Sequence, residues 1–144
     1  MKAAYKWLAF IIAAEVVVQA AAIAFGYARL GKYVDSGATL TKDTDSFPGM
    51  TSLVIHGVNG MMVIPALAIA FLVVAVLSRV PGAAKVGGIL LGMVLVQVML
   101  GIIGRSVPFL ALLHGILALG IFGYAALTGV RASRMENLRI DQPI

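Results

Sequence analysis

The sequence contains no cysteine and few charged residues, and both shortages narrow what the protein can be. Without cysteine there can be no disulfide, thiolate metal site, iron–sulfur cluster or covalently attached c-type haem. Only 12% of the 144 residues are charged, whereas 61% are hydrophobic, and the mean hydropathy is +1.03. A soluble domain of this length has too little interior to bury so much apolar surface. The composition therefore predicts that lipid surrounds most of the chain.

Long apolar segments occupy most of the chain, and each is about 20 residues or longer, which is enough to cross a bilayer. They lie at about residues 5–28, 51–78, 83–104 and 108–130. This pattern predicts an all-α membrane protein, a four-transmembrane-helix bundle that forms one domain over residues 1–130. The first segment is too long for the apolar region of a secretory signal peptide, so we expect it to remain as a span.

The polar segments are few, and we expect loops or ends in them. Residues 29–50 combine mixed charge with glycine and proline, which predicts an outer loop that could include a short surface helix. Thr51 or Ser52 is the expected N-cap of the second span, and Pro65 is expected to kink that span. The tail, residues 131–144, is predicted to be only partly ordered.

Positive charge is distributed unevenly between the two sides of the four spans. One side has Lys2, Lys6, Arg79, Lys85, Arg131, Arg134 and Arg139, and the other has Arg29, Lys32, Lys42 and Arg105. The side with more positive charge is expected to be cytoplasmic. Both termini should therefore lie on the cytoplasmic side of a bacterial plasma membrane. These basic residues flank apolar segments and are not interleaved with exposed aromatic residues, so they do not indicate nucleic-acid binding.

The sequence also repeats a pattern, which predicts that the bundle is built from two repeated helical hairpins. Val16-Val17-Val18-Gln19, then Gly26, Pro48 and His56-Gly57, matches Val94-Leu95-Val96-Gln97, then Gly104, Pro108 and His114-Gly115. The chain has two histidines in all, and they occupy equivalent places in the two hairpins.

This placement puts His56 and His114 at similar depths, roughly 7–10 Å inside the outer ends of their helices. If both side chains point to the bundle axis, two neutral imidazoles face each other, as in the axial ligation of a b-type haem. A zinc site fits less well, because two histidines leave coordination positions unfilled.

Other residues extend the predicted haem site. Gly57, Gly60 and Gly115 would let a flat macrocycle approach the helices. Arg29 and Arg105, at the outer ends of the first and third spans, are placed to meet haem propionates.

Several of these polar residues have a second interpretation. A histidine inside a membrane helix often makes only an interhelical hydrogen bond. Gln19 and Gln97 are expected to hold the first and third spans together, or else to contact a cofactor edge or a quinone. Glu15 is either a proton-handling or cofactor-facing group, or a protonated carboxyl bonded to a neighbouring helix.

Two segments resemble the haem A synthase family: Q-V-M-L-G from Gln97 and L-L-H-G-I-L-A-L-G from Leu112. They are similar to the third and fourth helices of a four-helix half of that family. Each such half binds haem through histidines near the outer ends of its second and fourth helices, so the resemblance implies haem ligation by His56 and His114. The chain has Leu53 where those enzymes typically carry a glutamate, and it lacks the cysteine pair that many of them carry. The resemblance therefore extends to haem binding and not to haem oxidation.

Together these observations predict a membrane-embedded b-type haem protein with bis-histidine ligation. It would serve in electron transfer, or as a haem-carrying subunit of a larger respiratory or other redox complex. Two alternatives remain open: a cofactor-free accessory subunit of a membrane complex, and a quinone- or lipid-handling enzyme that uses Glu15 and the outer loop.

Overall fold

The structure is a computed structural model that describes the backbone of residues 1–140 and the side chains of residues 1–136. Its elements are α1 (Lys2–Asp35), α2 (Met50–Val58), the π-helical segment η1 (Asn59–Val63), α3 (Ile64–Leu77), α4 (Ala83–Gly104) and α5 (Pro108–Ile140). No strand occurs within these residues, which confirms the all-helical prediction. Four helices, with α2, η1 and α3 counted as one, are long and apolar enough to cross a membrane. The chain is therefore a multi-pass membrane protein.

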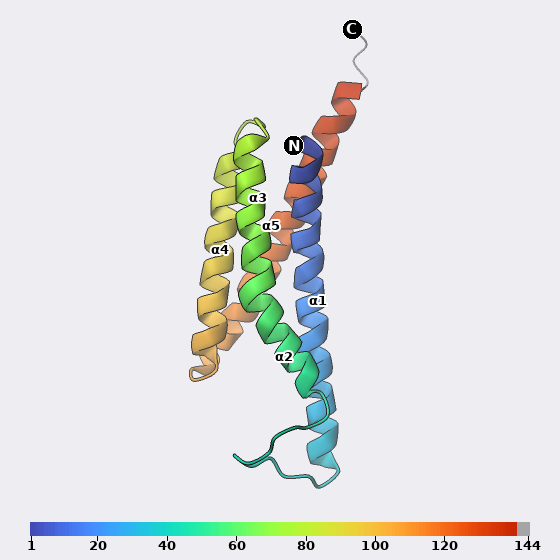
Figure 1. Cartoon of the computed structure of the whole chain (residues 1–144), viewed down its shortest axis with the longest axis vertical. Coiled ribbons are helices and arrows are strands. Elements are labelled where there is room, and N and C mark those ends of the chain that lie inside the picture. Colours follow the sequence, from blue (N-terminus) through green and yellow to red (C-terminus); the bar gives the residue numbers. More distant parts are fainter. Residues whose placement is uncertain (141–144) are drawn as a thin grey trace.

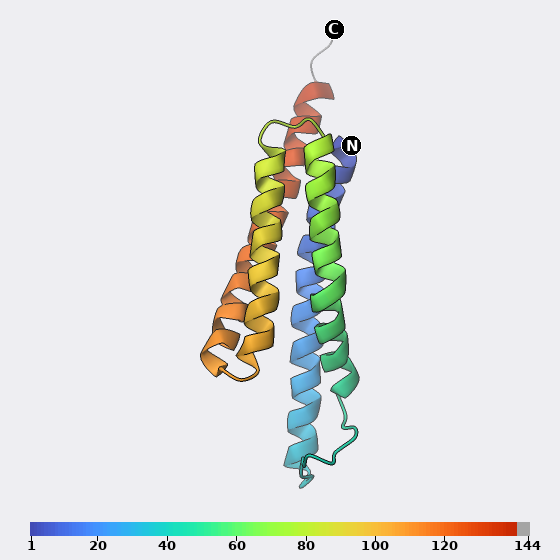
Figure 2. The ribbon, with the colours of Figure 1, turned by 60° about the vertical axis from the view of Figure 1, so that its left-hand side comes forward.

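The four spans form an elongated bundle (Figure 1). α1 packs against α5 and against α2 and α3, and α4 packs against α3 and α5. The helix formed by α2 and α3 therefore lies diagonally opposite α5, and α1 lies opposite α4. The start of α1, the end of α5 and the α3–α4 turn share one end of the bundle, which we call the terminal end (Figures 1 and 2). The opposite end has the loop of residues 36–49 and the α4–α5 turn, and we call it the loop end.

Two helices are longer than predicted. α1 does not end near residue 28 but continues to Asp35, where Gly37 adopts a left-handed φ of 90° and its N–H donates to the carbonyl of Val34. Such a glycine is a common helix terminator because it has no Cβ to oppose that conformation. α5 passes the expected end at residue 130 and runs to Ile140, so most of the predicted tail is helical. Residues 141–144 lie outside the described part of the chain.

The start of α2 differs from the prediction as well. Its N-cap is Gly49, with a φ of 101°, and neither Thr51 nor Ser52 caps the helix. A Cβ on Gly49 would lie 2.5 Å from the carbonyl oxygen of Gly26 and 2.7 Å from the Cβ of Arg29. The loop can return to α1 this closely only because position 49 is glycine.

The second span changes direction near Pro65, as the sequence predicts. The π-helical segment η1 lies directly before α3, in which Pro65 occupies the first turn. Proline has no N–H to donate to the preceding turn, and wide turns of this kind accommodate the missing bond. α2 and α3 therefore meet at an angle (Figure 1).

The hydrophobic core fills only the terminal half of the bundle. Its side chains, in the described residues, come from Tyr5–Val16 of α1, Ile64–Ala75 of α3, Ala83–Val94 of α4 and Ile121–Ala132 of α5. Within this core the rings of Tyr5 and Phe71 stack with centroids 4.9 Å apart. Toward the loop end no hydrophobic side chain of the described residues is buried. The predicted histidine site lies in that half, beyond the packed core.

Candidate functional site

The two histidines meet across the bundle at the loop end. His56 lies on α2 and His114 on α5, which are diagonal to each other, and their ring centroids are 6.2 Å apart. The ring planes form an angle of 70°, so the rings are not stacked on each other. Both side chains are half-buried. The structure thus brings together the two residues on which the sequence-based prediction depends.

Each histidine is held by the backbone of the preceding long helix. Nδ1 of His56 lies 3.2 Å from the carbonyl oxygen of Gln19, and Nδ1 of His114 lies 3.0 Å from that of Gln97. A carbonyl oxygen only accepts hydrogen bonds, so Nδ1 carries the proton in both rings. In the neutral imidazole the remaining lone pair is then on Nε2, which is available as a metal ligand. This is the orientation that a backbone carbonyl imposes on metal-binding histidines in general.

The glutamine side chains behave differently from the prediction. Nε2 of Gln97 donates to the carbonyl oxygen of His114 at 2.9 Å, so Gln97 joins α4 to α5. The expectation that it joins the first and third spans is wrong, because α1 and α4 are diagonal and the nearest acceptor belongs to α5. Nε2 of Gln19 and Oε1 of Gln97 are buried without a hydrogen-bond partner in the described residues. Each hairpin therefore leaves one glutamine amide atom unpaired beside its histidine.

The three predicted glycines have different surroundings. A Cβ added to Gly57 or Gly115 would meet no atom within 4 Å, so both border open space next to the histidines. A Cβ on Gly60 would lie 3.4 Å from Oε1 of Gln19, so Gly60 faces that amide. A side chain at Gly57 or Gly115 would therefore meet no neighbour, whereas one at Gly60 would contact Gln19.

A fourth glycine, Gly101, was not predicted to belong to the site. A Cβ at this position would lie 3.1 Å from Cε1 and 3.2 Å from Nδ1 of His114, so the imidazole lies directly against the α4 backbone. Gly101 follows Gln97 by four residues and therefore shares its face of the helix. That spacing was a usable signal, but the many glycines of this span also indicate ordinary helix packing.

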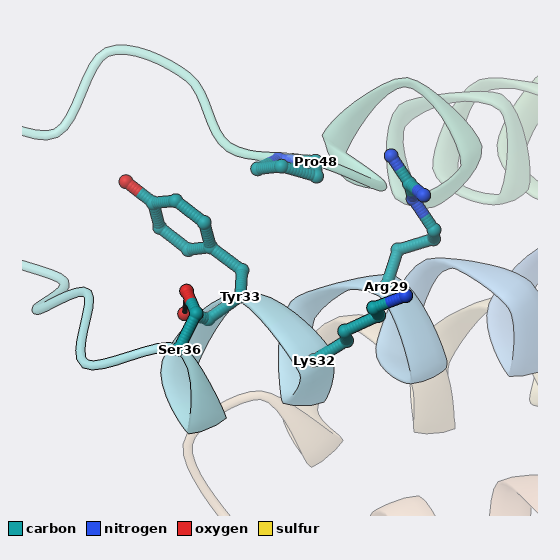
Figure 3. Close-up of a pocket in the computed structure, with 5 residues that line it drawn as sticks. All are labelled: Arg29, Lys32, Tyr33, Ser36 and Pro48. Atoms are coloured by element: carbon teal, nitrogen blue, oxygen red, sulfur yellow. Dashed lines mark hydrogen bonds between the residues drawn. The ribbon is translucent and has the colours of Figure 1, made fainter.

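The two predicted arginines lie farther out than the histidines. Arg29 is ten residues beyond Gln19, or about 15 Å along α1. With Lys32, Tyr33, Ser36 and Pro48 it lines a cavity of about 210 Å³ between α1 and the outer loop (Figure 3). Arg105 is the exposed C-cap of α4. The structure places both at the loop end and shows no contact of either with a histidine.

Glu15 has a partner on a neighbouring helix. Nδ2 of Asn59 donates to Oε2 of Glu15 at 2.8 Å, which connects α1 to the first residue of η1. This is the kind of bond expected for a structural role. Asn59 follows His56 by three residues and Gln19 follows Glu15 by four, so each pair shares one helix face. The Asn59–Glu15 and His56–Gln19 hydrogen bonds therefore lie one helical turn apart between the first and second spans.

The residues present suit an axially ligated haem better than a bare metal ion. Within the described residues no group of three or more His, Cys, Asp or Glu side chains could hold a metal ion. A metal–imidazole bond is about 2 Å long, so two rings on opposite sides of one ion have centroids roughly 6 Å apart. The 6.2 Å between the two ring centroids is close to that separation.

Comparisons with protein-family models, curated proteins and solved structures return no match. The case for any function therefore depends on the geometry of this chain alone.

Proposed function

We propose that this protein is an integral membrane b-type haem protein in which His56 and His114 are the two axial ligands. The observation that carries the proposal is the histidine pair itself. The rings are 6.2 Å apart across the bundle, and each is oriented through Nδ1 by a backbone carbonyl. A hydrogen bond without ligation would need only one such ring and would give no reason for the two to meet.

The activity that such a site supports is electron transfer, alone or as a subunit of a larger redox complex. Haem supplies one-electron chemistry at iron, and two histidine ligands leave no coordination position for a substrate. The chain's own contribution is to hold both imidazoles in one tautomer and to keep the site within apolar surroundings. The unpaired Nε2 of Gln19 and the guanidinium groups of Arg29 and Arg105 are the donors available to polar edges of the cofactor.

The proposal includes an orientation and an internal repeat. The seven basic residues of the terminal end favour a cytoplasmic location for that end and for both termini, in a bacterial plasma membrane. The equivalent contacts of Gln19 with His56 and of Gln97 with His114 support two related hairpins. The similarity to one half of a haem A synthase fits this arrangement, and no haem-modifying activity is proposed.

The test is a visible spectrum of the protein purified from haem-replete cells, together with single alanine variants of His56 and His114. We expect the bands of a low-spin, six-coordinate haem in the wild type and their loss in either variant. The matched control is Met61→Ala, because Met61 lies near His56 on the same span but is 56% exposed toward lipid.

The outcomes separate the alternatives. A wild-type spectrum that survives both histidine substitutions would contradict the proposed ligation. A protein that neither carries nor takes up haem would favour the cofactor-free accessory subunit, in which the histidines serve only as hydrogen-bond donors between helices.

A further inference from the structure

The terminal end of the bundle contains a second cavity that the haem proposal does not use. Its volume is about 400 Å³, within the range of small-molecule sites of roughly 300–1,000 Å³. It lies between the α3–α4 turn and the neighbouring parts of α1 and α5. The lining residues that matter here are Tyr5, Val80, Val86, Arg131, Arg134 and Met135. The cavity is thus at the opposite end of the bundle from the histidines.

The two walls of this cavity differ in chemistry. The wall from the α3–α4 turn and the start of α4 is apolar, with Val80 and Val86. The α5 wall carries Arg131 and Arg134, which are three residues apart and so lie on one helix face. Both arginines are exposed. The cavity therefore combines an apolar surface with two adjacent positive charges.

Among the residues whose side chains the structure describes, no acidic one lines the cavity to neutralise these arginines. The nearest described carboxylate on α5, Glu136, is paired with Lys6 at 2.7 Å. The hydroxyl of Thr128, which also lines the cavity, donates to the carbonyl oxygen of Tyr124 in its own helix. The charge available to a ligand here is consequently positive.

We propose that this cavity binds the headgroup of an anionic glycerophospholipid. Arg131 and Arg134 would bind the phosphate, and one acyl chain would run from there along Val86 toward the membrane interior. The position of the cavity along the bundle supports this occupant. The cavity lies where the apolar span α3 ends and α4 begins, which is the level of the lipid headgroups in a bilayer. Basic pockets between transmembrane helices on the cytoplasmic side are a known mode of anionic-lipid recognition.

The experiment is native mass spectrometry of the full chain in detergent, with equal concentrations of phosphatidylglycerol and phosphatidylcholine that carry identical acyl chains. We expect one phosphatidylglycerol molecule to bind in preference to phosphatidylcholine. A cationic side chain near a membrane surface is worth about a fivefold change in anionic-lipid affinity, so Arg131→Gln and Arg134→Gln should each weaken binding about fivefold. Both residues are exposed, so neither change should unfold the bundle.

The matched control is Lys85→Gln, which removes one positive charge from the same end of the bundle. Lys85 is exposed and does not line the cavity. It should leave phosphatidylglycerol binding unchanged. Equal binding of the two lipids in the wild type would overturn the proposal, and so would an equal loss in all three variants, which would indicate diffuse charge attraction.

Discussion

Gly101 offers a direct test of how His114 is held. Its replacement by alanine would place a Cβ 3.1 Å from Cε1 and 3.2 Å from Nδ1 of the imidazole, closer than ordinary van der Waals contact. The ring would have to move by a few tenths of an ångström. The hydrogen bond between Nδ1 and the carbonyl oxygen of Gln97, now 3.0 Å long, would be strained by that movement. The substitution therefore tests the hydrogen bond that orients His114.

The magnitude follows from two opposing effects. Alanine in place of glycine inside a helix stabilises it by about 1 kcal/mol. Overpacking of a filled site typically costs about 1–3 kcal/mol. Gly92→Ala is the matched control, because Gly92 lies in the same helix and a Cβ there would meet no atom within 4 Å. Since the helix-propensity gain is common to both variants, Gly101→Ala should be less stable than Gly92→Ala by about 1–3 kcal/mol.

The assay is reversible unfolding by sodium dodecyl sulfate in mixed micelles, which gives the free energy of unfolding of each variant. The same pair of variants made in a His114→Ala background should show a much smaller difference, because the crowded ring is gone. Equal stability of Gly101→Ala and Gly92→Ala with His114 present would refute the close contact. A difference that persists after the removal of His114 would assign the crowding to another neighbour.

Three further predictions concern other parts of the chain. Glu15→Leu should lower the free energy of unfolding by about 1 kcal/mol, because the Asn59 amide loses its acceptor, whereas Glu15→Gln keeps an oxygen and should be nearly silent in the same unfolding assay. Gly49→Ala should cost more than Gly37→Ala in that assay, by about 1–3 kcal/mol, because both glycines have positive φ but only Gly49 contacts another helix; equal costs would exclude crowding against α1. A reporter that matures only outside the cell should be inactive when fused after Ile144, and activity of this fusion would reverse the proposed orientation.

The sequence predicts the spans well because lipid imposes a simple rule. Each crossing needs about 20 apolar residues, so hydropathy alone finds all four. The sequence also predicts that His56 and His114 lie at a similar depth in the membrane. Each lies six residues after the first residue of its helix, α2 or α5. Their approach across the bundle then requires that both side chains point to the bundle axis. Hydropathy does not mark where a helix stops in water, and for that reason α1 and α5 exceed their predicted ends.

Contacts that depend on the choice of neighbour could not be predicted from the sequence. The pattern shows that Gln97 must find a partner in the bundle but not which adjacent helix supplies it. In the structure the partner is the carbonyl oxygen of His114 on α5, whereas the sequence-based expectation was the first span, α1. Gly101 is similar: its four-residue spacing from Gln97 puts both on one helix face, but the other glycines of the span hide which of them contacts a ring. Both features become visible only when the order of helices around the bundle is known.

The bundle has a closely packed terminal half and a loosely packed loop-end half, and this division affects how the histidine variants must be interpreted. Lipid solvates apolar side chains as well as a protein core does, so helices associate in a membrane through close packing and hydrogen bonds. Small residues such as Ala9, Ala68 and Ala75 provide close packing at the terminal end, far from the histidines. Loss of one interhelical hydrogen bond costs only about 0.6 kcal/mol on average, so His56→Ala should leave the bundle folded. A missing haem spectrum in a variant whose free energy of unfolding, compared with that of the haem-free wild type, is nearly unchanged would then report a lost ligand and not a lost fold.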